Sequence, residues 1–262
     1  MAPSRVALIG LGNAGFAIHL PALAGIRGAS IVGACDVDLQ RRERAAAKWR
    51  VPVFADLDHM LGETRPDVVV IGTPPTLHAE QCLRSFAASA DVICEKPFAS
   101  SVAEAETVLQ VARDAGRRIA LNHEFREMPI FRAVLDAAAA SQGAPPVFVQ
   151  LWQLMDLPPW AEPGWRRQLL QGTLYEAGVH LVDYAMAIFR EKPHAVSATI
   201  STCGVREEHS DAVALVTLEF SDGRLAQIVQ NRLCKGETQY FEVRVDTRES
   251  SLRASFGGRA RI

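Results

Sequence analysis

The sequence predicts an α/β protein in which a doubly wound parallel sheet is followed by an α/β domain with an open, mostly antiparallel sheet. Two observations support this fold class. Before His123, short apolar runs take turns with stretches of helical periodicity, which is typical of parallel strands covered by helices on both faces. After His123, strand-like segments follow one another with turn signals between them, which indicates antiparallel pairing.

The first half contains five apolar runs and four helical stretches. The runs are dense in Val, Ile, Leu and Ala and cover residues 6–9, 31–34, 68–71, 92–94 and 119–121. The stretches with apolar residues at helical spacing cover residues 14–24, 39–49, 78–88 and 102–115. Their alternation predicts the doubly wound sheet.

The second half opens with a helix over 125–140, which ends at the breaker Gly143-Ala144-Pro145-Pro146. Strands are expected over residues 147–155, 195–203, 212–220, 225–233 and 240–246, with one helix over 174–189 between them. Ser221-Asp222-Gly223 is a good hairpin turn between two of these strands. We therefore divide the chain into two domains, 1–123 and 124–262.

Composition excludes several classes of protein. The formal net charge is −2 and the pI about 6.4, without the basic excess of a nucleic-acid binder. No apolar run reaches the ~18 residues of a membrane span, and no signal peptide pattern is visible. The five cysteines form no C-x-x-C pair, so we expect buried, reduced thiols in a cytoplasmic protein.

A glycine loop follows the first strand directly and opens a helix. It reads Gly10-Leu11-Gly12-Asn13-Ala14-Gly15. The first glycine permits a tight turn, the second lets a pyrophosphate approach the backbone, and the third packs the helix on the strand. The helix N-terminus offers free N–H groups to phosphates. The loop therefore predicts dinucleotide binding.

Asp36 ends the second strand, about 20 residues after the glycine loop. A carboxylate there can accept hydrogen bonds from both hydroxyls of the adenine ribose and would repel a 2′-phosphate, so NAD is favoured over NADP. Arg41 and Arg42 are near enough in sequence to hold that phosphate, so NADP stays possible. The alternative for Asp36 is a helix N-cap or turn residue.

Two more segments follow strands in the first half. Thr73-Pro74-Pro75-Thr76-Leu77-His78 comes after 68–71, and Glu95-Lys96-Pro97 comes after 92–94. Both are expected at the carboxyl ends of strands, where ligands bind in open α/β sheets.

With these segments the sequence resembles the Gfo/Idh/MocA family of oxidoreductases. The resemblance rests on "VALIGLGNAG", "DVVVIGTPPTLHAEQ", "VICEKPFASSVAEAE", "LNHEFREMP" and "GTLYEAGVHLVDYAM", in family order and at family-like spacing. It implies an NAD(P)-binding Rossmann domain in 1–123 and a substrate-binding and oligomerisation domain in 124–262. It also implies a homo-oligomer, dimer or tetramer, formed through the second sheet.

The resemblance implies roles for individual residues. Lys96 matches the lysine that touches both substrate and nicotinamide, and His180 matches the acid/base histidine. Glu176 matches a position that is aspartate in many members, and Trp165-Arg166 resembles a pair on the substrate side. The expected cofactor-binding residues are Gly10, Gly12, Asn13, Ala14, Gly15, Asp36, Arg41, Thr73, Pro74, Pro75, His78, Glu95, Lys96 and Asn122.

These residue types suit the oxidation of an alcohol, which needs a base for the hydroxyl proton. Histidine ionises near neutral pH, so we expect His180 to be the base and the Lys96 ammonium to stabilise the alkoxide. Glu176 and His180 are four residues apart and share a helix face with Asp183. That face could instead bind a metal, but we expect none because no third ligand motif is evident.

The predicted activity is hydride transfer between a nicotinamide and a sugar, cyclitol or related polyhydroxy substrate. The alternatives are a hydrolase or epimerase of this fold that uses transient oxidation by tightly bound NAD, and a non-catalytic NAD-binding protein. Two departures from the family pattern leave the substrate open, namely Glu176 itself and Gln171-Gly172-Thr173 in place of a glycine run. The chain also stops early for the family, so it is either a natural short form or truncated at the C-terminus.

Overall fold

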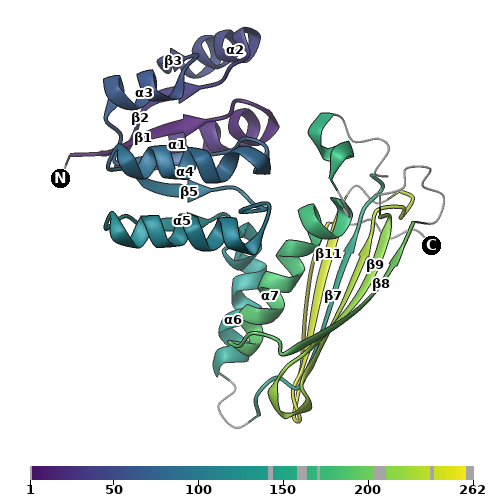
Figure 1. The fold of residues 1–262 in the computed structure, drawn as a ribbon. Coiled ribbons are helices and arrows are strands. Elements are labelled where there is room, and N and C mark those ends of the chain that lie inside the picture. The colour runs from purple at the N-terminus through teal and green to yellow at the C-terminus, as the bar shows by residue number, and fades with distance from the viewer. Residues whose placement is uncertain are drawn as a thin grey trace. The chain divides into compact units, whose positions relative to one another are not determined.

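The computed structural model describes residues 2–140, 144–157, 164–169, 172–202, 211–236 and 239–257. The chain forms two compact units, Met1–Asn122 and His123–Ile262. In Figure 1 the first unit runs from purple to teal and the second from teal to yellow. Among the described residues, no helix is both long and apolar enough to cross a membrane.

The first unit contains a six-stranded sheet whose strands are all parallel to their neighbours. Its order, β3-β2-β1-β4-β5-β6, is that of a dinucleotide-binding fold, in which the strand order reverses between β1 and β4. The predicted parallel sheet is thereby confirmed. The strands are β1 Ser4–Ile9, β2 Ala29–Cys35, β3 Val53–Phe54, β4 Val68–Ile71, β5 Asp91–Cys94 and β6 Ile119–Leu121.

Helices connect these strands, as Figure 1 shows. The predicted helix over 14–24 is a π-helical turn that continues as an α-helix, and β3 and α3 were not predicted. The helical segments are η1 Gly15–His19, α1 Leu20–Gly25, α2 Leu39–Trp49, α3 Leu57–Thr64, η2 Pro75–Leu77, α4 His78–Ala87 and α5 Val102–Asp114. Asp38, Asp56 and Ser101 cap α2, α3 and α5 with their side chains.

Two apolar clusters cover the two faces of this sheet. Ala7 and Ile9 of β1 belong to one cluster, together with residues of α3, α4 and α5. Val6 and Leu8 belong to the other, together with residues of α1 and α2. Because both faces are buried at the centre of the sheet, β1 and β4 carry continuous apolar runs over residues 6–9 and 68–71.

The second unit contains a six-stranded sheet in the order β12-β11-β7-β10-β9-β8. Neighbours are antiparallel except for β7 and β10, which confirms a mostly antiparallel sheet. The turn at Ser221–Gly223 joins β9 and β10, as predicted. The strands are β7 Phe148–Leu154, β8 Ala195–Ser201, β9 Val213–Glu219, β10 Leu225–Asn231, β11 Tyr240–Asp246 and β12 Ser251–Gly257.

Two helices, α6 Pro129–Ala140 and α7 Val179–Phe189, pack together and against this sheet (Figure 1). The prediction of one helix over 125–140 is wrong at its start, where a short 3₁₀ turn, η3 Glu124–Arg126, precedes α6. Proline has no N–H and disfavours a helical residue before it, so α6 begins at Pro129. A further π-helical turn, η6 Thr173–Gly178, leads into α7.

Aromatic rings fill the core between these helices and the sheet. Phe241 of β11 stacks on Phe125 with 4.4 Å between ring centroids, and lies 4.6 Å edge-on from Phe131 of α6. The buried hydroxyl of Tyr184 on α7 donates a hydrogen bond to the carbonyl oxygen of Phe131 at 2.6 Å. This core fixes the segment around Phe125 relative to α7.

Candidate functional site

The glycine loop connects β1 to the first helix of unit 1. Gly10 has φ +89°, and a Cβ there would lie 2.8 Å from the backbone of Gly72. A Cβ on Gly15 would lie 1.8 Å from the carbonyl oxygen of Gly10. At Gly12, by contrast, the nearest atom to such a Cβ is Nη1 of Arg41, at 3.8 Å. The first and last glycines are therefore required by the fold, whereas the middle one leaves room for a phosphate group.

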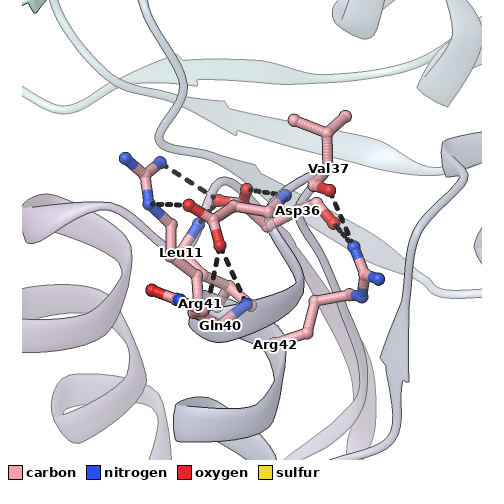
Figure 2. A network of polar contacts seen from close by, with 7 residues as sticks. Leu11, Asp36, Val37, Gln40, Arg41 and Arg42 are labelled. Atoms are coloured by element: carbon pink, nitrogen blue, oxygen red, sulfur yellow. Dashed lines mark hydrogen bonds and ion pairs between the residues drawn. The ribbon is translucent and has the colours of Figure 1, made fainter.

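Asp36 lies at the end of β2 and braces this loop, as Figure 2 shows. Its buried carboxylate accepts hydrogen bonds from the backbone N–H of Leu11 at 2.7 Å and of Asp38 at 2.9 Å, one on each oxygen. A carboxylate oxygen has two lone pairs, so each oxygen can still accept a ribose hydroxyl. The cap of α2 is Asp38, so Asp36 combines the predicted binding position with a turn-bracing role.

The two arginines after Asp36 differ in their contacts (Figure 2). Arg42 Nη1 donates to the carbonyl oxygens of Asp36 at 2.7 Å and Val37 at 2.9 Å. Arg41 is half-exposed, and its Nη1 lies 3.6 Å from Oδ2 of Asp36. Arg42 is thus committed to the backbone, and Arg41 is the cation next to the Asp36 carboxylate.

The side chain of Glu95, which follows β5, contacts residues from two other elements of unit 1. Its Oε1 accepts a hydrogen bond from Nδ2 of Asn122, after β6, at 2.7 Å. The same oxygen lies 2.9 Å from Nε2 of His19, on the helix after the glycine loop. Burial acts to raise the pKa of Glu95, but the hydrogen bonds with His19 and Asn122 outweigh it and lower the pKa. Glu95 therefore stays ionised beside Lys96, whose backbone N–H it also accepts at 3.2 Å.

His78 ties together the two loops that follow β4 and β5. Its ring is fully buried, with Nδ1 2.9 Å from the carbonyl oxygen of Pro97 and Nε2 2.9 Å from that of Thr73. Burial lowers the pKa of this ring, although both carbonyls act to raise it. A neutral imidazole can donate to only one of them. Thr73 Oγ1 also donates to Oε1 of Gln81 on α4 at 2.6 Å, so the loop is held at both ends.

In unit 2, Glu176 lies in the π-helical turn that precedes α7. Arg166 Nε donates to its Oε1 at 2.6 Å, and the Arg166 guanidinium stands 4.7 Å from the centroid of the Trp165 ring. The three substrate-side residues that the sequence picked out in this region therefore lie together. Gln171, which departs from the family pattern, lies outside the described residues.

His180 lies at the start of α7 and is 4% exposed. Its ring packs against Phe125 at 4.8 Å and edge-on against His123 at 5.7 Å between centroids. Its Nε2 lies 3.7 Å from the carboxylate oxygen Oε1 of Glu124. Asp183 is instead held by Arg126 through two hydrogen bonds of 2.5 Å. Sequence reasoning did not single out Glu124.

Asp211 anchors the start of the helix that carries Glu176 and His180. It is 1% exposed, and its two carboxylate oxygens accept the backbone N–H groups of Thr173 and Leu174 at 2.7 Å each. Its carbonyl oxygen accepts the Thr173 hydroxyl at 2.5 Å. These N–H groups have no partners inside the helix, so Asp211 acts as a remote cap. Within the described ranges, no group of three or more His, Cys, Asp or Glu is placed to hold a metal ion.

Comparisons with known proteins agree with this geometry. Residues 4–123 match the Gfo/Idh/MocA oxidoreductase family with an NAD-binding Rossmann fold, and residues 138–249 match the Gfo/Idh/MocA C-terminal domain. A 1,5-anhydro-D-fructose reductase from Ensifer adhaerens is 27% identical over 71% of this chain and 57% of its own length. A D-glucoside 3-dehydrogenase from Escherichia coli is 27% identical over 84% of this chain and 68% of its own length.

The fold is also found in solved structures. A myo-inositol 2-dehydrogenase from Lactobacillus plantarum superimposes with a TM-score of 0.87, at 19% identity, over 96% of this chain and 76% of that one. Among the sequence relatives, the chain spans little more than half the length of the anhydrofructose reductase that it matches. Residues 4–123 match the N-terminal domain of this family, and residues 138–249 match its C-terminal domain. The chain therefore belongs to the Gfo/Idh/MocA family of oxidoreductases with an NAD-binding Rossmann domain.

Proposed function

We propose that this protein is an NAD(P)-dependent dehydrogenase or reductase that acts on a CH–OH group of a sugar, cyclitol or related polyhydroxy substrate. The observation that carries the proposal is the carboxylate of Asp36, held against the glycine loop with lone pairs left for a ribose. Relatives named as sugar and inositol dehydrogenases or reductases support the substrate class.

Unit 1 would hold the dinucleotide. The space at Gly12 fits a pyrophosphate, and Asp36 fits the ribose of NAD better than that of NADP. The loop of Thr73, Pro74 and Pro75 would lie along the bound cofactor, and the side chain of Asn122 would contact it. When bound, the nicotinamide supplies the hydride acceptor or donor.

The protein's own side chains would manage the proton and the charge. His180 takes the hydroxyl proton, and the ammonium of Lys96 stabilises the oxygen as negative charge develops on it. A positioned proton acceptor is typically worth about 10²–10⁴ in rate. Glu176, oriented by Arg166, accepts a hydrogen bond from a neighbouring substrate hydroxyl, and Trp165 offers an apolar ring face to the carbons.

The experiment is a screen of purified protein with NAD and NADP against myo-inositol, glucose and other polyols, read as absorbance of the reduced nicotinamide. The expected result is turnover with at least one polyol, lowered at least 100-fold in His180→Ala with unchanged NAD affinity. Bound NAD without net reduced nicotinamide would favour a hydrolase or epimerase instead. NAD binding with no conversion of any polyol would favour a non-catalytic role.

We further propose a cytoplasmic homo-oligomer, dimer or tetramer, that pairs through the sheet of unit 2. The sheet face opposite α6 and α7 carries half-exposed apolar side chains, among them Leu215 and Leu225. The described cysteines Cys35, Cys82, Cys94 and Cys234 are free, which suits a reducing compartment. Light scattering on the full chain tests the oligomer, and Leu215→Glu is expected to lower the measured mass.

A further inference from the structure

His19 is a buried polar residue at the end of the π-helical turn η1, which begins at Gly15 of the glycine loop. It is 8% exposed, and its Nε2 lies 2.9 Å from Oε1 of Glu95, a residue 76 positions further along the chain. The carboxylate of Glu95 is ionised and carries no hydrogen, so the hydrogen of this bond must be on Nε2. His19 therefore donates to Glu95, whether its ring is neutral or protonated.

The two oxygens of Glu95 have different tasks. Oε1 receives two donors from separate elements, His19 of η1 and Nδ2 of Asn122, which follows β6. Oε2 accepts the backbone N–H of Lys96 at 3.2 Å. The backbone N–H of Glu95 donates to the carbonyl oxygen of Ile71 in β4 at 2.9 Å. The contacts of Oε1 thus set the orientation of the carboxylate, and Oε2 transmits it to the backbone of Lys96.

The environment of Glu95 makes the bond with His19 important for this orientation. A single hydrogen bond lets a carboxylate turn about that bond, whereas two donors from separate elements fix its plane. Burial acts to raise the pKa of Glu95, and the hydrogen bond with His19 is the largest of the effects that lower it. Among the described residues, the other ionisable groups that interact with this charge are Lys96 in the same loop, Cys94 at the end of β5 and His78 at the start of α4.

We propose that His19 is a positioning residue for Lys96: it fixes the carboxylate of Glu95, which in turn holds the backbone of the lysine. The inference rests on the proposed function, in which the Lys96 ammonium stabilises the substrate oxygen. Sequence reasoning gave His19 no role. In this arrangement, the helical segment that opens with the glycine loop also aligns the lysine that acts in the chemical step.

Two variants separate the hydrogen bond of His19 from the volume of its ring. His19→Leu fills much of the same space without a donor, whereas His19→Gln keeps a donor nitrogen at about the same distance from the backbone. If His19→Leu does not fold, His19→Asn replaces it, because its amide is one methylene shorter. The matched control is His59→Leu, since His59 of α3 is an exposed histidine of the same unit and lies 4.0 Å from Glu63. Thermal unfolding followed by circular dichroism checks that each variant is folded.

The first test needs neither cofactor nor substrate, and uses NMR on the full chain. In His19→Leu, hydrogen exchange at the Lys96 amide should become about 10-fold faster, while the Glu95 amide, held by Ile71, should not change. His19→Gln should restore most of the protection. The Glu95 carboxyl carbon, assigned from its loss in Glu95→Gln, should titrate with a higher pKa in His19→Leu than in the wild type. Unchanged exchange at Lys96, an unchanged pKa of Glu95, or equal effects in His59→Leu overturn the inference.

The second test measures turnover. With a polyol that the wild-type chain oxidises, kcat of His19→Leu should fall about 10-fold or more, and the KM for NAD should change about 2-fold or less. His19→Gln should keep most of kcat. Equal losses of kcat in the two variants, or a raised KM for NAD at unchanged kcat, overturn the inference. A wild-type chain that converts no polyol contradicts the proposed function alone, because the exchange test still decides the link from His19 to Lys96.

Discussion

Asp211→Asn should loosen the start of the helix that carries Glu176 and His180. The two oxygens of the wild-type carboxylate each accept one backbone N–H, from Thr173 and from Leu174. Asparagine has a single oxygen, so its NH₂ group must face one of these N–H groups. That N–H loses its acceptor in a site where Asp211 is 1% exposed and water is excluded.

The size of the effect follows from these two bonds. A buried N–H left without a partner costs about 1–3 kcal/mol. The bond that remains changes from a charged to a neutral acceptor, which costs about 1 kcal/mol more. The free energy of unfolding of unit 2 should therefore fall by about 2–4 kcal/mol. At about 2–4 °C per kcal/mol, the melting temperature should fall by roughly 4–16 °C.

Urea and thermal unfolding followed by circular dichroism measure this loss, and amide hydrogen exchange places it in the chain. The exchange rates of residues 173–180 should rise more than those of the sheet. The matched control is Asp222→Asn, because Asp222 lies in an exposed turn at φ +60°, which asparagine tolerates. Equal stability of Asp211→Asn and Asp222→Asn would refute the reasoning.

Three further predictions concern other contacts. Asp36→Asn should raise the ratio of NADP to NAD affinity about 10-fold or more, because the repelling charge is lost while Arg41 remains; calorimetric titration with each dinucleotide checks this. The pKa of Glu95 in the folded protein is lowered, so its ionised form stabilises unit 1 at pH values above the unfolded pKa of about 4.3. That stability is lost as the pH falls through the folded-state pKa. Glu95→Gln should therefore flatten the acid limb of stability against pH, and an unchanged limb contradicts the argument. Tyr184→Phe removes a buried hydrogen bond to Phe131 and should cost about 1–2 kcal/mol in urea unfolding, whereas a neutral result would mean that another donor replaces it.

The central strands β1 and β4 of unit 1 are predictable because burial on both faces leaves continuous apolar runs. β4 is found at its observed bounds, Val68–Ile71, on this signal. β3 has only Val53 and Phe54, too few residues for any periodicity. β12 was not among the expected strands although Leu252, Ala254 and Phe256 alternate along it, and in the structure Ala254 is buried in the core and Leu252 packs against it.

Some residues of the candidate site are likewise predictable from the sequence, and others are found only in the structure. The glycine loop and Asp36 are found from spacing because the intervening helix has a nearly fixed length. The pairs His19–Glu95 and Asp211–Thr173 join residues 76 and 38 positions apart, and local sequence holds no trace of such contacts. Only the folded chain reveals Glu124 beside His180, because a turn, and not the helix of His180, supplies it.

The π-helical turn at Thr173–Gly178 has a consequence for how this site varies between related sequences. A π-helical turn equals an α-helical turn with one residue inserted, because its hydrogen bonds span five residues instead of four. Deleting one residue from the turn would restore an α-helix and rotate Glu176 by about 100° around the axis relative to His180. A single codon deletion would therefore change which side chain of this turn takes the place of Glu176, the proposed substrate-binding residue, while leaving α7 and the sheet intact. Sequence alignments of this segment should place gaps at Thr173–Gly178 before they match Glu176 to the aspartate of other family members.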